Sequence, residues 1–234
     1  MTNINQSKFK KATEVFNSVY DKYDIMNDLM SFGTHRIWKK RFIDWMNPKE
    51  NEYLLDVASG TGDIAKAFIT RTKNRSHICC VDSNNFMLSE NKKRLKSFSN
   101  ISWHHAQAEK LPFKNETFDI YAVSFGARNF YNLKMALKEA HRVLKIGGRF
   151  MCLEFSKIDN EILNKIYSTY SKSIPFLGKY IVGDSEPYEY LIDSIEKFYN
   201  QDELKRIILE SGFNEVQYRN LSGGIVAIHS GWKI

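Results

Sequence analysis

A glycine-rich turn is the first place where the residue types and their spacing point to chemistry. The segment Asp56-Val57-Ala58-Ser59-Gly60-Thr61-Gly62-Asp63 follows a short apolar run and leads into a helical pattern. Gly60 and Gly62 allow the backbone to turn tightly and to come close to a ligand. Asp82 ends the next apolar run, 22 residues after Gly60, where a carboxylate can accept hydrogen bonds from both hydroxyls of a ribose. The combination predicts a nucleoside cofactor at the carboxyl edge of a sheet.

The charges around this turn help to choose the cofactor. The spacing Gly60-x-Gly62-x-x-Ala65 also fits the loose dinucleotide fingerprint, so the glycines alone leave the cofactor open. A dinucleotide would place an anionic pyrophosphate over the turn. The turn carries Asp56 and Asp63 and no basic residue, so it favours a cationic ligand such as S-adenosylmethionine, which has an ammonium and a sulfonium group. The alternative for Asp63 is a helix-start residue that interacts with the helix dipole.

The elements that must position these residues alternate between strand and helix patterns. Strands are predicted at 53–57, 78–81, 101–104, 118–124 and 150–155, with helices at 63–71, 86–95 and 133–144 between them. Two further runs, 215–219 and 225–229, flank Ser222-Gly223-Gly224 and predict a terminal antiparallel hairpin. The order predicts an α/β fold, a doubly wound and mostly parallel seven-stranded sheet.

The rest of the chain is predicted to complete one domain. Residues 1–50 are predicted to form a helical cap with helices at 9–30 and 37–46. Residues 51–156 form the cofactor-binding core, residues 157–200 form a helical insertion, and residues 201–234 form a final helix and the hairpin. The insertion is rich in tyrosine, phenylalanine, leucine and isoleucine. Three interpretations stay open for it: an apolar groove for a substrate, ordinary packing of added helices, or a homodimer contact.

Composition excludes several classes of protein. No stretch of 18 apolar residues suggests a membrane span, and the first residues do not form a secretory signal. The three cysteines are too few for a disulfide framework, which favours a reducing cytoplasm. Neither cysteines nor histidines show metal-ligand spacing, so no metal is predicted.

The net charge of +7 leaves three interpretations of the surface. Residues 51–150 carry 16 basic and 9 acidic groups, whereas 151–234 carry 9 basic and 12 acidic ones. The basic excess would suit nucleic acid, an anionic lipid surface, or an ordinary mixed surface. A nucleic-acid methylase is disfavoured because residues 124–126, after the fourth predicted strand, read Ser-Phe-Gly, without the Pro-Pro-aromatic sequence of base-amino methylases. We therefore expect no nucleic-acid partner.

Four longer motifs narrow the prediction. They are residues 23–39 (YDIMNDLMSFGTHRIWK), 142–148 (RVLKIGG) with 153–156 (LEFS), 124–129 (SFGARN) and 223–229 (GGIVAIH). With the glycine turn, they resemble the ubiquinone/menaquinone biosynthesis C-methyltransferases, a family of class I S-adenosylmethionine-dependent methyltransferases. The resemblance runs from about Val15 to Ile234. Ile146 and Ser59 depart from it where proline and glycine are usual, and neither side chain carries a reacting group.

The resemblance implies a reaction, a substrate and a place. It implies methylation of a ring carbon in a polyprenylated quinol, either a demethylmenaquinol or a 2-methoxy-6-polyprenyl benzoquinol. Because that substrate resides in a membrane, it implies a cytoplasmic protein with peripheral contact at the inner face. The resemblance implies that Thr61, Asp82, Gln107, Ala108 and Ser124 contact the cofactor, together with Gly60 of the glycine turn. Two alternatives stay open. The protein could be another methyltransferase that acts on a small phenol or a sterol-like carbon, or a non-catalytic scaffold.

Carbon methylation directs attention to the loop after the fourth predicted strand. The acceptor ring needs a stabilised phenolate, and a guanidinium such as that of Arg128 can supply positive charge. Asn129 can orient a quinol oxygen, so Arg128 and Asn129 are predicted as the catalytic pair. The alternatives are a structural ion pair or a cofactor contact for Arg128 and a turn role for Asn129. The resemblance implies that Tyr23, Asp24, Asn27 and His35 close over the site. Two roles stay open for His35, a general base or a capping hydrogen bond.

Overall fold

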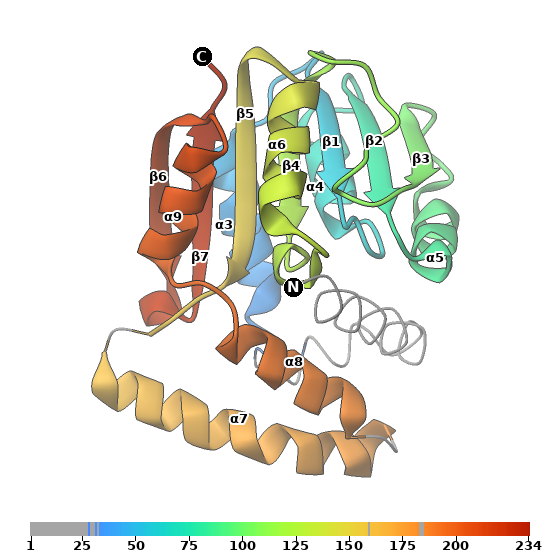
Figure 1. Cartoon of the computed structure of the whole chain (residues 1–234). Helices are drawn as coiled ribbons and strands as arrows, with labels where there is room; N and C mark the ends of the chain where they lie inside the picture. Colours follow the sequence, from blue (N-terminus) through green and yellow to red (C-terminus); the bar gives the residue numbers. More distant parts are fainter. Residues whose placement is uncertain (1–27, 29–30, 32, 159, 183–184) are drawn as a thin grey trace.

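A single seven-stranded sheet forms the centre of the protein (Figure 1). The computed structural model describes residues 28, 31, 33–158, 160–182 and 185–234. The strands lie in the order β3-β2-β1-β4-β5-β7-β6. Their bounds are β1 Tyr53–Val57, β2 His77–Asp82, β3 Ile101–His105, β4 Phe118–Ser124, β5 Leu144–Phe155, β6 Asn214–Leu221 and β7 Val226–Trp232. The first five run parallel, and β7 is antiparallel to both β5 and β6, which confirms the predicted sheet and hairpin.

Helices cover both faces of the sheet. On one face lie α3 (His35–Met46), α4 (Asp63–Arg71) and α5 (Asn85–Leu95), which bury Trp38 and Phe68 against the strands. On the other face α6 (Leu133–Val143) and α9 (Gln201–Glu210) pack over Tyr121 and Phe150. Parallel strands covered on both faces need apolar residues throughout, which is why their sequences read as continuous apolar runs. The predicted helix 9–30 lies outside the described residues.

The cysteines belong to this core. Cys79 and Cys80 lie side by side in β2 and Cys152 lies in β5, and all three thiols are free and buried. Burial raises the pKa of Cys79 to about 11 and raises the pKa of Cys80 and Cys152 well above the ordinary thiol value. The thiols therefore stay protonated and act as small apolar groups.

One predicted boundary is wrong. We expected the helix to reach residue 144 and to stop at Gly147-Gly148, with the strand beginning at 150. Instead α6 ends at Val143 and β5 begins at once with Leu144, whose backbone is extended. The carboxyl terminus accounts for the difference, because Lys233 donates from Nζ to the carbonyl oxygen of Leu144 and accepts from the Gly147 N–H.

Two helices of the insertion lie below the carboxyl edge of the sheet (Figure 1). They are α7 (Glu161–Val182) and α8 (Glu186–Glu196), and they pack against each other. Helix α8 also contacts the short 3₁₀ helix η1 (Ala127–Asn129) that follows β4. Among the described residues, every helix is too short or too polar to cross a membrane.

A buried histidine lies between β7 and α9. His229 is 1 % exposed, and its Nε2 lies 2.9 Å from the carbonyl oxygen of Gln201, to which it donates as the neutral tautomer. Its Nδ1 has no hydrogen-bond partner among the described residues. Burial lowers the pKa of His229 to about 4, so the native state holds the neutral ring.

This histidine predicts an acid-sensitive fold. The folded-state pKa lies below the unfolded value of about 6.5, so the stabilisation is present above pH 6.5 and is lost as the pH falls toward 4. The free energy of unfolding should lose about 3 kcal/mol from this group across that window. Urea unfolding at several pH values should show a flatter dependence for His229→Gln. An identical slope in the two proteins would contradict the assignment.

Candidate functional site

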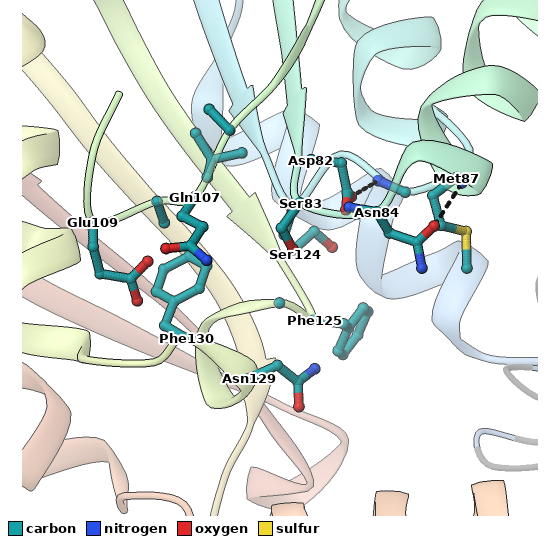
Figure 2. A pocket seen from close by; sticks show the side chains of 16 residues that line it. Asp82, Ser83, Asn84, Met87, Gln107, Glu109, Ser124, Phe125, Asn129 and Phe130 are labelled. Carbon is teal, nitrogen blue, oxygen red and sulfur yellow. Dashed lines mark hydrogen bonds between the residues drawn. The ribbon is translucent and has the colours of Figure 1, made fainter. Parts of the chain in front are cut away.

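A cavity of about 750 Å³ opens at the carboxyl ends of β1, β2 and β4 (Figure 2). Ligands of open α/β sheets bind at this edge, beyond the carboxyl ends of the strands. Six of the eight predicted site residues line it, namely Gly60, Asp82, Gln107, Ala108, Ser124 and Asn129. Thr61 lines a smaller cavity of about 340 Å³, which shares Gly60 and Ser124 with the first. The structure thus brings together residues from four separate loops.

Asp82 is held rigidly at the end of β2. Its Oδ2 accepts a hydrogen bond from the Gly60 N–H at 2.9 Å, and its Oδ1 accepts one from the Asn84 N–H at the same distance (Figure 2). Burial raises the pKa of Asp82, while these N–H groups oppose that shift. Each oxygen keeps a further lone pair for a ligand hydroxyl. The carboxylate is therefore ready to accept from a ribose.

The smaller cavity contains an acceptor with no partner. Asp56 is 1 % exposed, and its Oδ2 has no hydrogen-bond partner among the described residues. Burial raises the pKa of Asp56 to about 8. The buried Ser124 hydroxyl lines both cavities, and it too has no hydrogen-bond partner among the described residues. A cationic ligand group here would satisfy both, so these residues fit the ammonium end of S-adenosylmethionine.

Asp63 has cationic neighbours that the sequence of the turn does not reveal. Sequence reasoning placed no basic residue beside Asp63, but Lys39 from α3 lies 2.7 Å from its Oδ2 and Arg94 from α5 lies 3.0 Å from its Oδ1. Burial raises the pKa of Asp63, yet the two cations outweigh burial and leave it lowered. Asp63 is therefore already neutralised, and Asp56 provides the unpaired acceptor.

The loop after β4 comes unusually close to the glycine turn. Phe125 has a positive φ of 58°, as does Ala58 at 52°. A Cβ at Gly126 would lie 2.4 Å from the Cβ of Ala58, so only glycine fits there. The close approach places the Phe125 ring in the wall of the cavity (Figure 2). Two loops that are distant in sequence thereby share one surface.

Arg128 does not occupy the place that we predicted for it. Its side chain is 3 % exposed, and Nη1 donates to Glu154 Oε1 at 2.8 Å and to the Phe125 carbonyl oxygen at 2.6 Å. Nε donates to the Ser194 hydroxyl at 3.3 Å. The residues that line the cavity do not include Arg128. The geometry supports the alternative of a structural ion pair, because a carboxylate as buried as that of Glu154 requires a cation.

Asn129 does face the cavity (Figure 2). Its Oδ1 accepts a hydrogen bond from the Tyr190 hydroxyl of α8 at 2.8 Å, which leaves the amide nitrogen to donate elsewhere. Burial raises the pKa of Tyr190 to about 12, so the phenol stays a donor. Phe125 and Phe130 provide aromatic walls on either side. This end of the cavity combines one polar group with two rings, as a planar phenolic ligand requires.

His35 lies away from this cavity. Its Nδ1 is 3.0 Å from the Ser31 hydroxyl, and burial together with Lys39 and Arg36 lowers the pKa of His35. It lines a separate groove between α3 and α4, which supports the capping interpretation rather than a general base. The predicted residues Tyr23, Asp24 and Asn27 lie outside the described residues. Within residues 33–158, 160–182 and 185–234, no three His, Cys, Asp or Glu side chains gather as metal ligands.

Sequence reasoning missed several residues that line the cavity or hold it. Asn84 caps α5 by accepting from the N–H groups of Phe86 and Met87, a role that its position two residues after Asp82 would have suggested. Phe125 and Phe130 stood beside the predicted pair, but an aromatic residue in a loop does not reveal which way it points. Tyr190 belongs to the aromatic-rich insertion, but its contact with Asn129, 61 residues away, could not be predicted.

The fold has many structural relatives. A SAM-dependent methyltransferase from Aquifex aeolicus superposes with a TM-score of 0.66 at 15% identity, covering 93% of this chain and 98% of the relative. A SAM-dependent methyltransferase from Thermotoga maritima, described as a possible histamine N-methyltransferase, gives 0.66 at 20% identity, covering 94% and 99%. At these identities the likeness establishes the fold alone.

Sequence comparison gives the family. The chain is 50% identical over 230 residues to the ubiquinone/menaquinone biosynthesis C-methyltransferase of Rickettsia akari, covering 95% of this chain and 92% of the relative. It is 46% identical to the enzyme of the same name from Brucella anthropi, covering 95% and 87%. The model of the ubiE/COQ5 methyltransferase family matches residues 1–233. The chain therefore belongs to the ubiE/COQ5 methyltransferase family.

Proposed function

We propose that this protein transfers a methyl group from S-adenosylmethionine to a ring carbon of a polyprenylated quinol. The acceptor is a demethylmenaquinol, a 2-methoxy-6-polyprenyl benzoquinol, or both, and the whole chain acts as one methyltransferase domain. The observation that carries the proposal is the cavity itself, which has a ribose-binding carboxylate, Asp82, at one end and the Asn129 amide between two aromatic rings at the other. Family membership identifies the reaction for which such a cavity is suited.

The cofactor end is assigned residue by residue. Asp82 accepts from the ribose hydroxyls, and Gln107 and Ala108 lie where the base edge is read. Asp56, Thr61 and the Ser124 hydroxyl receive the charged amino-acid portion. When bound, the cofactor supplies an electrophilic methyl on a sulfonium, which becomes a neutral thioether after transfer. A cation beside Asp56 favours the ionised carboxylate, whose pKa burial otherwise raises to about 8.

The acceptor end aligns and activates the ring. The Asn129 amide nitrogen donates to a quinol oxygen, and Phe125 and Phe130 hold the ring plane. Loss of a proton from a ring hydroxyl drives electron density onto the ring carbon, which bonds to the methyl group as the bond from that methyl to sulfur breaks. The same carbon then loses its hydrogen as a proton and the ring oxygen takes a proton back, so the quinol is restored and one proton is released in total. Arg128 acts here as a positioning residue, since it holds the loop that carries Asn129 and does not itself reach the ring.

The substrate also suggests where the protein works. A polyprenyl chain stays in the bilayer, so the ring must be taken from its inner face by a protein that approaches from the cytoplasm. Helix α8 contacts η1, which carries Asn129, and α7 packs against α8. Within the described residues, the insertion therefore lies next to the acceptor end of the site, where the prenyl chain would leave.

Turnover with radiolabelled cofactor tests the proposed reaction directly. We expect methyl transfer to the reduced quinols and none to the quinones under anaerobic conditions without reductant, because only the quinol has an ionisable ring hydroxyl. Both benzoquinol and naphthoquinol acceptors should be assayed. Equal rates with the oxidised and reduced forms would overturn this account of activation, and activity only on a small phenol would overturn the substrate assignment.

Removing the ribose acceptor should weaken cofactor binding. Asp82→Ala loses two hydrogen bonds to a charged group, which corresponds to about 3 kcal/mol or about a hundredfold rise in Kd. Calorimetric titration of the purified protein measures this. The control is Glu203→Ala, which should leave Kd unchanged. It also removes a carboxylate that accepts from a backbone N–H, but in the capping box of α9, far from the cavity. An unchanged Kd for Asp82→Ala would remove Asp82 from the site.

Asn129 and Tyr190 should affect the chemical step rather than cofactor binding. Asn129→Ala should lower kcat and kcat/KM together by about a hundredfold, as expected for loss of a preorganised donor. Tyr190→Phe keeps the ring but frees the Asn129 amide, and about a tenfold loss of kcat is expected. Tyr188→Phe is a matched control, because its hydroxyl is also buried on α8 but has no hydrogen-bond partner among the described residues. Equal effects of the two tyrosine variants would argue against a positioning role for Tyr190.

A further inference from the structure

The outer side of α7 exposes more apolar surface than any function assigned so far explains. This helix has 22 residues and is therefore about 33 Å long. Its inner side is buried at Ser171 and Ile174. Its outer side leaves Ile162 74 % exposed, Ile166 62 % exposed and Phe176 72 % exposed. These three residues are called the α7 stripe below.

The three residues lie on one side of the helix, which contains Pro175. At about 100° per residue, Ile166 is about 40° from Ile162 on one side and Phe176 about 40° on the other. Other exposed apolar residues, such as Ile37, Met135 and Ile146, lie on separate elements. Single exposed apolar residues are ordinary, but an aligned row along one helix marks a contact surface.

We infer that the α7 stripe is a docking surface for an anionic lipid bilayer, an inference that rests on the proposed function because it explains how a membrane-borne substrate is reached. The charges of α7 itself complement such a surface, although residues 151–234 as a whole carry more acidic than basic groups. Its sequence contains lysines at 165, 172 and 179 and a single acidic residue, Glu161. Lys165 and Lys179 are exposed, and long lysine side chains can extend to lipid phosphates while the apolar residues enter the acyl boundary.

The position of α7 agrees with this inference. Figure 1 places α7 on the far side of α8 from the sheet, below the carboxyl edge where the cavity opens. Helix α8 contacts both α7 and the loop that carries Asn129. A bilayer under α7 therefore lies one helix away from the acceptor end of the site. None of the described helices can cross a membrane, so α7 would lie in the plane of the interface.

A second copy of the chain explains the stripe less well. A stable protein interface buries about 800 Å² on each partner and uses about 20 to 30 residues on each side. Three large apolar residues on one helix offer much less than that. Partial insertion into lipid requires no complementary protein surface, since the bilayer adapts to the side chains.

Vesicle sedimentation tests the inference on the full chain. The probe is a liposome of equal parts phosphatidylglycerol and phosphatidylcholine. The variant Ile162→Ser/Ile166→Ser/Phe176→Ser should bind at least tenfold more weakly than the unaltered protein, with unchanged thermal unfolding because the three residues are exposed. Ile146→Ser is the matched control, since that residue is 71 % exposed in another element, and its binding should be unchanged. Lys165→Glu/Lys179→Glu should weaken binding to these vesicles and not to pure phosphatidylcholine.

Turnover of two substrates separates this inference from the proposed function. The triple variant should keep its rate on a short-chain, water-soluble quinol and lose rate on a long-chain quinol held in the vesicles. If the triple variant binds vesicles as well as the unaltered protein, the inference is overturned. If light scattering then also shows that the variant has lost a dimer, the stripe is a contact between two copies of the chain. If the unaltered protein methylates neither quinol while the triple variant still loses vesicle binding, the proposed function fails and the lipid surface stands.

Discussion

The buried ion pair between Arg128 and Glu154 is the contact on which the shape of the acceptor end depends. Glu154 lies near the end of β5, and its two oxygens accept from the Arg128 side chain, the Arg128 backbone N–H and the Phe155 N–H. The same guanidinium also holds the Phe125 carbonyl oxygen and the Ser194 hydroxyl. Removing one partner of a buried pair typically costs about 3–5 kcal/mol, because the other charge is left unpaired. The pair therefore fixes the loop between β4 and η1, and with it the direction of Phe125 and Asn129.

The cofactor end is organised by a different balance of charge. Asp56, Asp63 and Asp82 all lie close to the glycine turn, and three unpaired carboxylates at this depth would repel one another. The protein resolves this in three ways. Lys39 and Arg94 neutralise Asp63, backbone N–H groups hold Asp82, and burial leaves Asp56 with a pKa of about 8 that an incoming cation would lower. The cavity is thus acidic at the one point where a cationic ligand can complete it.

Features encoded locally could be predicted from the sequence, and features made by distant contacts could not. The glycine turn, the Asp82 strand end, the alternation of strands and helices and the terminal hairpin each depend on a few neighbouring residues, and the structure has all four. The position of Arg128 depends on Glu154, which is 26 residues away and on the next strand. The neutralisation of Asp63 needs residues from α3 and α5, and the orientation of Asn129 needs Tyr190 from α8. The early start of β5 likewise reflects Lys233 at the other end of the chain.

The burial of the cysteines has a consequence for the chemistry proposed at this site. Quinones, the oxidised form of the proposed acceptor, are electrophiles that add to thiolates and arylate them irreversibly. The reactive species is the thiolate, and its population falls tenfold for each unit by which the pKa rises. Cys79, Cys80 and Cys152 are closed off within two central strands and remain protonated at neutral pH. An enzyme built this way can handle a redox-active ring repeatedly without being inactivated by its own substrate's oxidation product.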